Sequence, residues 1–381
     1  MIGVSSMPFD VFKSEKLIQK YTDHYFNQTK KIVCSSGEIN VKYAVFMRRP
    51  VIFTPRLMVD NLNYVAKKRN FSIKIDLCYE EGDWVGAGDP LLFISGPFSK
   101  LVDLETLFLQ NLGPACVAAY NAYIMCRDLP KVSFLAMDAR HCAGVEMSEI
   151  MSYAASVGSK VAQKEFGSIG FIGNATEATA HYFGNNRAFG TMPHSLIGYA
   201  GSTLKAAELY SNTFPNEDMT VLVDYFGQEV TDTLEVCEKY RDLALKGGLS
   251  IRLDTHGGRF IEGLDTEKSY AVLESQAPKS IRQYRSENEM KWLVGTGVTA
   301  AAIYHMRQTL DKYKFHKVKI VASSGFSPAK CKVMSSVNAP IDVIGTGSYL
   351  PDIWDETYAT ADIVEYDGVK SVKKGREFLF R

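Results

Sequence analysis

Short apolar runs recur along the chain from about residue 130, and each is followed by small or polar residues and then by a helical pattern. Continuously apolar runs of strand length that alternate with helices are typical of a parallel sheet covered by helices. Seven such units predict an irregular α/β barrel, and a doubly wound open sheet is the alternative architecture. The apolar runs are VSFLAMDARH, IGFIGNAT, AFGTMPHS, TVLVDYFG, SIRLDTHGG, KIVASSGF and DVIGTGSY, and the helical segments between them include 146–165, 195–211, 228–245 and 290–312.

The first third of the chain has a mixed pattern. Residues 9–28 predict an amphipathic helix, and NVKYAVFMRRPVIF predicts one or two strands. The alternating segment IKIDLCYEEGDWVGAGDPLLFISGP, with its Gly and Asp turns, predicts a pair of β-hairpins. A long apolar helix follows in LVDLETLFLQNLGPACVAAYNAYIM, with a possible break at Gly113-Pro114.

These patterns divide the chain into two domains. We expect an N-terminal α+β domain over residues 1–130 and an α/β barrel over residues 131–351. The tail 352–381 contains short strand-like pieces, and we expect it to return to the first domain.

Composition excludes several classes of protein. Lys plus Arg and Asp plus Glu are equal at 43 each, so the chain lacks the basic excess of a nucleic-acid binder. No apolar run approaches the roughly 18 residues of a membrane span, and the first residues lack a signal-peptide core, so we expect a cytoplasmic protein. The seven cysteines include no CxxC pair, which argues against a structural zinc site and a disulfide framework.

Polar residues at the ends of the apolar runs are the candidates for chemistry. In α/β barrels, functional groups gather at the carboxyl ends of the strands. The residues in these positions are Asp138, Arg140, Asn174, Thr191, His194, Asp224, Arg252, Asp254, Ser323, Gly325, Gly345 and Thr346.

Two late strands end in loops that suit phosphate. The run DVIGTGSY delivers small residues around Gly345 and Thr346, and IVASSGF delivers Ser323 and Gly325. Loops rich in backbone N–H and hydroxyl donors bind phosphate, although each loop alone is more often a simple turn. In barrels the loops after the last two strands often form one phosphate site, so the pair predicts phosphate binding.

Three further features carry charge or a nucleophile. Arg252 and Asp254 lie two residues apart on one side of a predicted strand, which fits either a ligand site or a buried ion pair. Arg140 follows a strand and suits an anionic ligand or a surface loop. His194, at the start of a predicted helix in GTMPHSLI, could act as a base, accept a phosphate or serve only as a hydrogen-bonded structural residue.

Nucleotide-binding motifs are weak. GTGVTA at 295–300 matches the dinucleotide fingerprint, but the nearest acidic residue, Asp311, falls within a helical pattern rather than at the end of a strand. The chain contains no GxxxxGK[ST] motif. The sequence therefore favours a helix start with small residues at 295–300.

Taken in order, several segments resemble nicotinate phosphoribosyltransferase, and the resemblance extends over nearly the whole chain. GTMPH and RLDT in this order are the more specific motifs. The segments are YTDHYF at 21–26, LETLFLQNL at 104–112, GTMPH at 190–194, LVDYF at 222–226, IRLD at 251–254, VASSG at 321–325 and IGTG at 344–347.

The resemblance implies a fold and a reaction. The implied fold is an α/β N-terminal domain on an irregular barrel, in a homodimer with shared active sites. The implied reaction joins nicotinate to 5-phosphoribosyl diphosphate (PRPP) and yields nicotinate mononucleotide and diphosphate. It also implies Mg²⁺ and coupling to ATP hydrolysis through a phosphohistidine.

The resemblance also assigns roles to residues. His194 matches the phosphorylated histidine, Tyr25 and Thr191 match residues that contact nicotinate, and Arg252 and Thr346 match contacts on the sugar-phosphate side. Tyr25 is expected to reach into the partner subunit. Arg140 follows the strand that carries a functional arginine in the family. Asp254 is expected to take part in catalysis, and the other expected substrate contacts are Asp224, Ser323, Gly325 and Gly345.

The sequence departs from the family pattern after IRLD, where THGGR replaces the SGD of many members. This departure affects how Asp254 and its neighbours hold a metal or the ribose. Three alternatives remain open: a sister enzyme that acts on nicotinamide or quinolinate, an enzyme that has lost the coupling to ATP, and a non-catalytic barrel that binds a sugar phosphate. Quinolinate carries two carboxylates and would require a denser cluster of Arg and Lys than the sequence shows.

Overall fold

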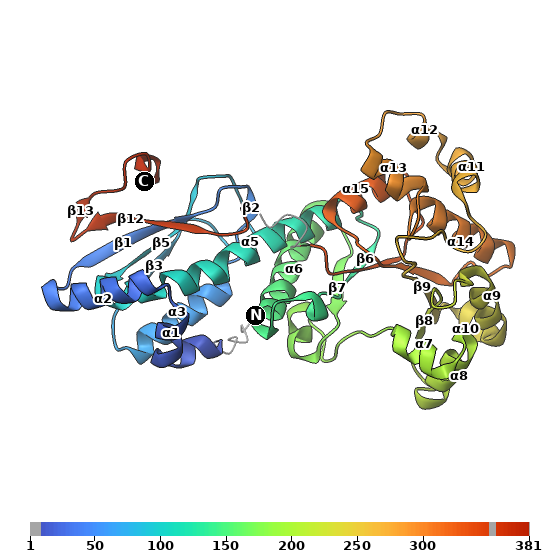
Figure 1. Cartoon of the computed structure of the whole chain (residues 1–381), viewed down its shortest axis with the longest axis horizontal. Helices are drawn as coiled ribbons and strands as arrows, with labels where there is room; N and C mark the ends of the chain where they lie inside the picture. Colours follow the sequence, from blue (N-terminus) through green and yellow to red (C-terminus); the bar gives the residue numbers. More distant parts are fainter. Residues whose placement is uncertain (1–8, 350–355, 381) are drawn as a thin grey trace. The chain divides into compact units, whose positions relative to one another are not determined.

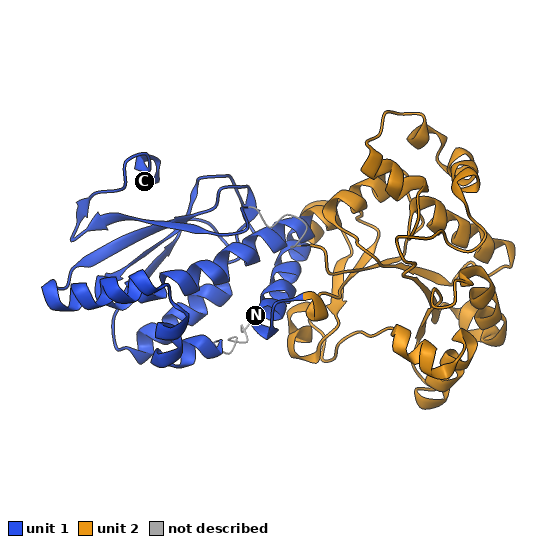
Figure 2. Cartoon of the chain, viewed as in Figure 1, with its two compact units in different colours: residues 1–123, 142–161, 350–381 blue, residues 124–141, 162–349 orange. Residues whose placement is uncertain are grey.

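The computed structural model describes residues 9–349 and 356–380. The chain divides into two compact units (Figure 2), the first made of residues 1–123, 142–161 and 350–381 and the second of residues 124–141 and 162–349. Within the described residues, no helix combines the length and the apolar composition needed to cross a membrane.

The first unit contains an antiparallel sheet of five strands in the order β13-β12-β1-β5-β3 (Figure 1). Two further short strands, β2 and β4, pair with each other. The strand bounds are β1 Asn40–Phe46, β2 Val51–Ile52, β3 Lys74–Leu77, β4 Trp84–Val85, β5 Pro90–Pro97, β12 Thr360–Tyr366 and β13 Val369–Lys370.

The predicted strands of this region are largely confirmed. NVKYAVFMRRPVIF forms the two strands β1 and β2. The predicted pair of hairpins is partly wrong, because β4 pairs with β2 rather than with its sequence neighbours, and β3 pairs directly with β5. The end of the chain supplies β12 and β13, and β12 pairs with β1.

Helices and short 3-10 turns complete the first unit. The predicted single helix over 9–28 is wrong, because the segment forms η1, α1 and the start of α2. Thr22 is extended between α1 and α2, and its hydroxyl donates to the carbonyl of Asp103 at 2.6 Å, which fixes the break. The bounds are η1 Asp10–Lys13, α1 Glu15–Tyr21, α2 His24–Ser36, α3 Arg56–Lys68, α4 Phe98–Leu101, η2 Val102–Leu104, α5 Glu105–Asp128, α6 Val145–Phe166 and η5 Glu377–Leu379.

Helix α5 continues through Pro114, so the expected break is absent. Buried apolar residues on both sides of the proline, among them Leu112 and Val117, compensate for the lost backbone hydrogen bond. Gly113 is required for a different reason. A Cβ there would lie 2.5 Å from the backbone N of Ala359, so glycine allows the chain before β12 to approach α5.

The second unit is built on a parallel sheet of six strands in the order β7-β6-β11-β10-β9-β8. This order follows the sequence cyclically, with one gap between β7 and β8. A doubly wound sheet would reverse its order at a switch point, so the arrangement supports the irregular barrel. The bounds are β6 Ser133–Ala136, β7 Gly170–Asn174, β8 Met219–Leu222, β9 Leu249–Leu253, β10 Lys319–Ala322 and β11 Val343–Thr346.

The gap explains the one predicted strand that does not form. The segment AFGTMPHS at 188–195 is not a strand, but it lies between the two edge strands. The Phe189 N–H donates to the carbonyl of Asn174 in β7, and the Met192 N–H donates to the carbonyl of Thr220 in β8. Pro193 has no N–H to donate and ends this contact, so the segment closes the barrel without a ladder.

Helices surround the sheet of the second unit (Figure 1). The predicted helix 146–165 is confirmed as α6, whereas three of the other predicted helices are each divided in two. Gly201, at φ 80°, ends α7, and the hydroxyl of Ser202 caps α8 by accepting from the Lys205 N–H. The bounds are η3 Ala139–His141, η4 Glu177–Phe183, α7 His194–Ala200, α8 Thr203–Thr213, α9 Glu229–Lys239, α10 Arg241–Lys246, α11 Thr266–Gln276, α12 Pro278–Ile281, α13 Glu287–Val294, α14 Ala300–Lys312 and α15 Pro328–Ser336.

Candidate active site

The carboxyl end of the parallel sheet carries a buried arginine that joins three segments. Arg252, in β9, is 5% exposed. Its Nε donates to the hydroxyl of Ser323 at 3.0 Å, and its Nη1 donates to the hydroxyl of Thr191 at 2.8 Å. Its Nη2 lies 2.9 Å from Oδ2 of Asp254. Arg252 therefore fixes the ends of β9 and β10 against the segment that closes the barrel.

The structure contains the buried ion pair that was one of the two interpretations of Arg252 and Asp254. The side chains are 6% and 14% exposed, so the ion pair is largely removed from water. The second carboxylate oxygen of Asp254 accepts from the hydroxyl of Ser323 at 2.8 Å. A buried charge pair with this many hydrogen bonds is rigid, which suits a site that must hold an anionic ligand in one geometry.

His194 is the first residue of α7, and its side chain is 43% exposed. Its Nε2 lies 3.2 Å from Oδ2 of Asp224, whose side chain is 8% exposed. The ring of Tyr225 lies 6.4 Å from the imidazole ring. The imidazole thus has one nitrogen oriented by a buried carboxylate, an arrangement that suits a nucleophile or a base.

Arg259 supports this pair and was missed by the sequence analysis. Its Nη2 donates to the backbone carbonyl of Asp224 at 2.7 Å and lies 2.6 Å from Oε1 of the fully buried Glu229. The same carboxylate oxygen accepts from the hydroxyl of Thr255 at 2.9 Å. Arg259 is the last residue of the segment THGGR, and the unusual sequence of this segment was the available indication that its arginine has a role.

The two predicted phosphate loops lie on neighbouring strands, since β10 pairs with β11. Ser324 and Gly325 both have positive φ, 78° and 67°. A Cβ at Gly345 would lie 2.4 Å from the sulfur of Met137, so a larger residue at this strand end would have to displace the Met137 side chain. The hydroxyl of Thr346 donates to the carbonyl of Phe326 at 2.5 Å and ties one loop to the other.

Two other predicted residues form no hydrogen bond or ion pair with the residues of this cluster in the described part of the chain. Tyr25 belongs to the first unit, is 59% exposed, and its hydroxyl lies 3.5 Å from Oδ2 of Asp23. Arg140 belongs to η3, is exposed, and its Nε lies 3.4 Å from Nε2 of His141. Both side chains are accessible to a ligand or a partner.

The dinucleotide reading of GTGVTA is not supported. The segment follows helix α13 and not a strand, and Thr299 caps α14. Gly297, at φ 82°, donates from its N–H to the carbonyl of Arg259 at 2.8 Å, and the hydroxyl of Thr296 donates to the carbonyl of Gly257 at 2.5 Å. The segment therefore holds the HGGR loop in place.

Among the described residues, no group of three or more His, Cys, Asp or Glu side chains could hold a metal ion by itself. Mg²⁺ commonly keeps most of its waters and binds through one or two carboxylates and the substrate phosphates. Oδ1 of Asp224 is buried and has no hydrogen-bond partner in the described part of the chain. This oxygen fits a ligand to Mg²⁺ that arrives with a phosphorylated substrate.

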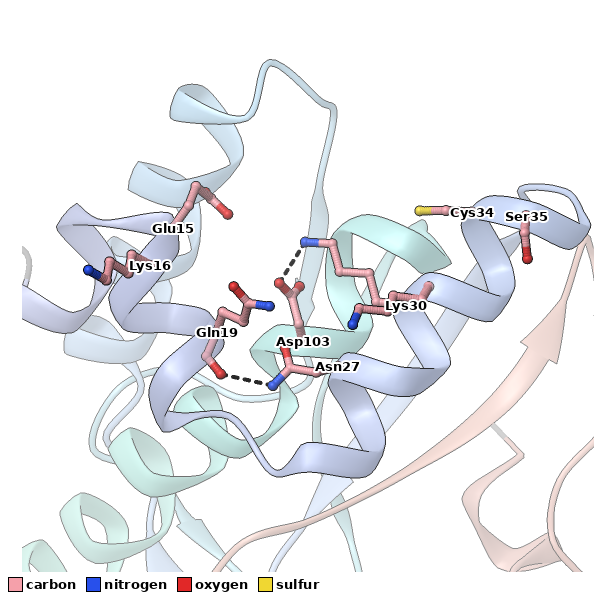
Figure 3. A pocket seen from close by; sticks show the side chains of 9 residues that line it. Glu15, Lys16, Gln19, Asn27, Lys30, Cys34, Ser35 and Asp103 are labelled. Carbon is pink, nitrogen blue, oxygen red and sulfur yellow. Dashed lines mark hydrogen bonds and ion pairs between the residues drawn. The ribbon is translucent and has the colours of Figure 1, made fainter.

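A cavity of about 640 Å³ lies in the first unit between α1 and α2 (Figure 3). Asp103 lies at its wall and pairs with Lys30 at 2.7 Å and with Arg69 at 2.7 Å. Arg69 also pairs with Glu15 at 2.9 Å. These charges satisfy one another and join α1, α2 and the end of α3, so the cluster stabilises the fold of the first unit.

Comparisons with known proteins address the fold. No protein-family model and no curated protein sequence matches the chain. The structure is similar to that of a nicotinate-nucleotide pyrophosphorylase from Pyrococcus furiosus, with 23% identity, a TM-score of 0.68, and 95% of this chain and 79% of that chain covered.

Two other solved structures are similar at lower identity. A nicotinate-nucleotide pyrophosphorylase from Ehrlichia chaffeensis has 12% identity and a TM-score of 0.58, with 94% of this chain and 99% of that chain covered. Human nicotinic acid phosphoribosyltransferase has 14% identity and a TM-score of 0.59, with 92% and 76% covered. The chain has the fold of these enzymes, and the resemblance that the sequence indicated is confirmed at the level of the fold.

Proposed function

We propose that this protein is a nicotinate phosphoribosyltransferase that joins nicotinate to PRPP, releases diphosphate and couples the reaction to ATP hydrolysis. The observation that carries the proposal is the position of Arg252. Its guanidinium contacts Thr191, Ser323 and Asp254, which are expected to contact nicotinate, to bind the phosphate and to take part in catalysis, respectively.

The proposed chemistry requires positioning more than acid–base catalysis. Loss of diphosphate leaves a developing positive charge on the ribose, and the pyridine nitrogen must be held close to the anomeric carbon. The late-strand loops at Ser323–Gly325 and Gly345–Thr346 would hold the phosphate, and Asp254 would face the ribose. Mg²⁺, bound through Asp224 and the substrate, would neutralise charge on the leaving diphosphate.

His194 is the proposed phosphate acceptor. Its imidazole is exposed and therefore accessible to ATP. Asp224 favours the tautomer with a proton on Nε2, which leaves Nδ1 as the nucleophile. A phosphate on His194 would place negative charge beside the diphosphate site and so link ATP cleavage to substrate affinity.

The charges favour a substrate with a single carboxylate. Arg252 is occupied by Asp254, and Arg259 is occupied by Glu229. Arg140 is exposed and forms no ion pair among the described residues. Of the three arginines considered for this site, Arg140 is then the one left for a carboxylate, and a single guanidinium suits nicotinate better than quinolinate, whose two carboxylates would need two cations.

The proposal includes a homodimer in which Tyr25 completes the partner's site. Complementation tests this directly, because Tyr25→Ala and His194→Ala would be inactive alone. If the site is shared, random mixing gives half heterodimers with one intact site each, and about a quarter of the wild-type activity returns. No recovery after mixing and re-association, with mixed dimers demonstrated, would refute shared sites.

A product assay tests the main proposal. Purified protein receives PRPP, Mg²⁺ and ATP with nicotinate, nicotinamide or quinolinate in turn. We expect nicotinate mononucleotide from nicotinate and little product from the other two. Product from quinolinate or nicotinamide alone would favour the sister enzymes, and binding of PRPP without any product would favour a non-catalytic sugar-phosphate-binding barrel.

A further inference from the structure

Lys330 lies in helix α15 and contacts the loop Ser323–Phe326. Only 5% of its surface is exposed. Its Nζ donates to the carbonyl of Ser324 at 2.8 Å and lies 4.2 Å from the centre of the Phe326 ring. It forms no ion pair with any carboxylate in the described residues. A buried ammonium group without a paired carboxylate is costly, so its position needs a reason other than stability.

The peptide that follows Ser324 gives that reason. Ser324 and Gly325 both have positive φ, and a serine rarely adopts this conformation without support. The Ser324 carbonyl and the Gly325 N–H belong to one planar trans peptide, so they point in opposite directions. The contact with Lys330 therefore aims the Gly325 N–H away from α15.

The other end of the loop is held in the same way. The hydroxyl of Thr346 donates to the carbonyl of Phe326 at 2.5 Å. In the described part of the chain, the N–H groups of Ser324, Gly325 and Phe326 donate to no protein acceptor. The carbonyls of Ser324 and Phe326 are thus engaged by protein donors, and the N–H groups remain available, which is the arrangement of an anion-binding loop.

We propose that Lys330 is a positioning residue for the phosphate of the substrate: it holds the Ser324 carbonyl so that the loop presents its N–H groups to the phosphate. The proposal rests on the proposed function and adds a residue that does not itself touch the substrate. A lysine suits this role because it contributes positive charge behind the loop as well as a hydrogen bond.

The charge of Lys330 should be visible in the pH dependence of binding. Burial lowers the pKa of Lys330 to about 8, against the opposing effects of the nearby Cys331 and Asp254. The other group that faces the ammonium is the uncharged ring of Phe326. Above pH 8 the ammonium loses its proton, the positive charge disappears, and affinity for phosphate should fall.

The test compares Lys330→Met, Lys330→Arg and Lys332→Met, the last being an exposed lysine of the same helix. PRPP binding is measured without the pyridine substrate, together with KM, kcat and thermal unfolding. We expect the dissociation constant to rise about 10-fold in Lys330→Met, with kcat changed less than about threefold. Lys330→Arg should recover part of the affinity, and Lys332→Met should match wild type.

The pH series adds a second criterion. The wild-type dissociation constant should rise above pH 8, and this rise should be absent in Lys330→Met. Equal binding by wild type and Lys330→Met, or a loss of kcat with unchanged affinity, would overturn the positioning role. Wild-type protein that binds PRPP and makes no product would refute the proposed function, but the comparison of PRPP binding by wild type and Lys330→Met would still test the role of Lys330. For a barrel that only binds phosphate, the same comparison is made with inorganic phosphate.

Discussion

Nε2 of His194 lies 3.2 Å from Oδ2 of Asp224, so the exposed imidazole at the start of α7 is oriented by a carboxylate at the end of β8. Arg259 stabilises the position of Asp224 by donating a hydrogen bond to its backbone carbonyl at 2.7 Å. The pair joins the segment that closes the barrel to the strand beside it. In the proposed reaction, phosphate transfer to His194 should therefore depend on Asp224 as well as on the histidine.

Replacement of Asp224 by asparagine tests this dependence. The amide keeps the shape but loses the negative charge that favours a proton on Nε2, so acid-labile labelling from γ-labelled ATP should fall roughly 10- to 100-fold. His194→Ala should remove the label completely. Asp242→Asn, at an exposed aspartate of α10, is the control. Label that persists in His194→Ala would place the phosphate elsewhere.

Replacement of Arg252 by lysine tests the bridge between the strand ends. An ammonium group cannot reach Thr191, Ser323 and Asp254 together, and Asp254 would keep a buried charge with a poorer partner. We expect KM for PRPP to rise about 10- to 100-fold and the free energy of unfolding to fall by about 1–3 kcal/mol. Steady-state kinetics and urea unfolding measure the two effects.

The control for Arg252 is Arg282→Lys, because the Arg282 side chain is 69% exposed and pairs with Glu274 on the surface. It should leave both quantities within experimental error. An Arg252→Lys protein with normal KM would mean that the buried ion pair serves the fold alone.

Much of this architecture could be predicted from the chain because its signals are local. The apolar runs located all six strands of the parallel sheet, and Arg252 and Asp254 share a face because they are two residues apart. The seventh run misled because AFGTMPHS is apolar enough for a strand, while Gly190 and Pro193 prevent a regular ladder.

The supporting residues could not be found in the same way. Arg259 and Lys330 act through backbone carbonyls of Asp224 and Ser324, and a contact with a carbonyl leaves no side-chain signature in the sequence. Their roles depend on which backbone carbonyls the folded loops bring close to each side chain, and the sequence does not show this. For Arg259, the only indication in the sequence was that HGGR differs from the segment found in many family members. For Lys330, the sequence contained no indication.

The crossing of α5 and α6 makes a stability prediction for Gly158. A Cβ there would lie 2.1 Å from the carbonyl oxygen of Ala119 and 2.9 Å from the backbone N of Tyr123. Because both contacts are backbone atoms of another helix, the helices would have to separate. Gly158→Ala should lower the free energy of unfolding by about 3 kcal/mol or prevent folding. Lys160→Ala, at an exposed position of α6, should remain close to wild type in the same thermal and urea measurements.

Glu105, the first residue of α5, makes stability depend on pH. Burial raises its pKa from 4.5 to about 7, and the negative charges of Asp362 and Asp23 act in the same direction. Between these two values the folded protein binds the proton more tightly than the unfolded chain does. The contribution of Glu105 to stability is therefore complete below pH 4.5 and is lost as the pH rises through 7.

Glu105→Gln removes this titration while keeping the shape of the neutral acid. The difference in unfolding free energy, variant minus wild type, should increase by about 2 kcal/mol between pH 5 and pH 8. Urea unfolding at a series of pH values measures it, and Glu287→Gln, at an exposed position of α13, provides the control. A difference that stays constant with pH would show that the Glu105 carboxylate remains ionised in the folded protein throughout this range.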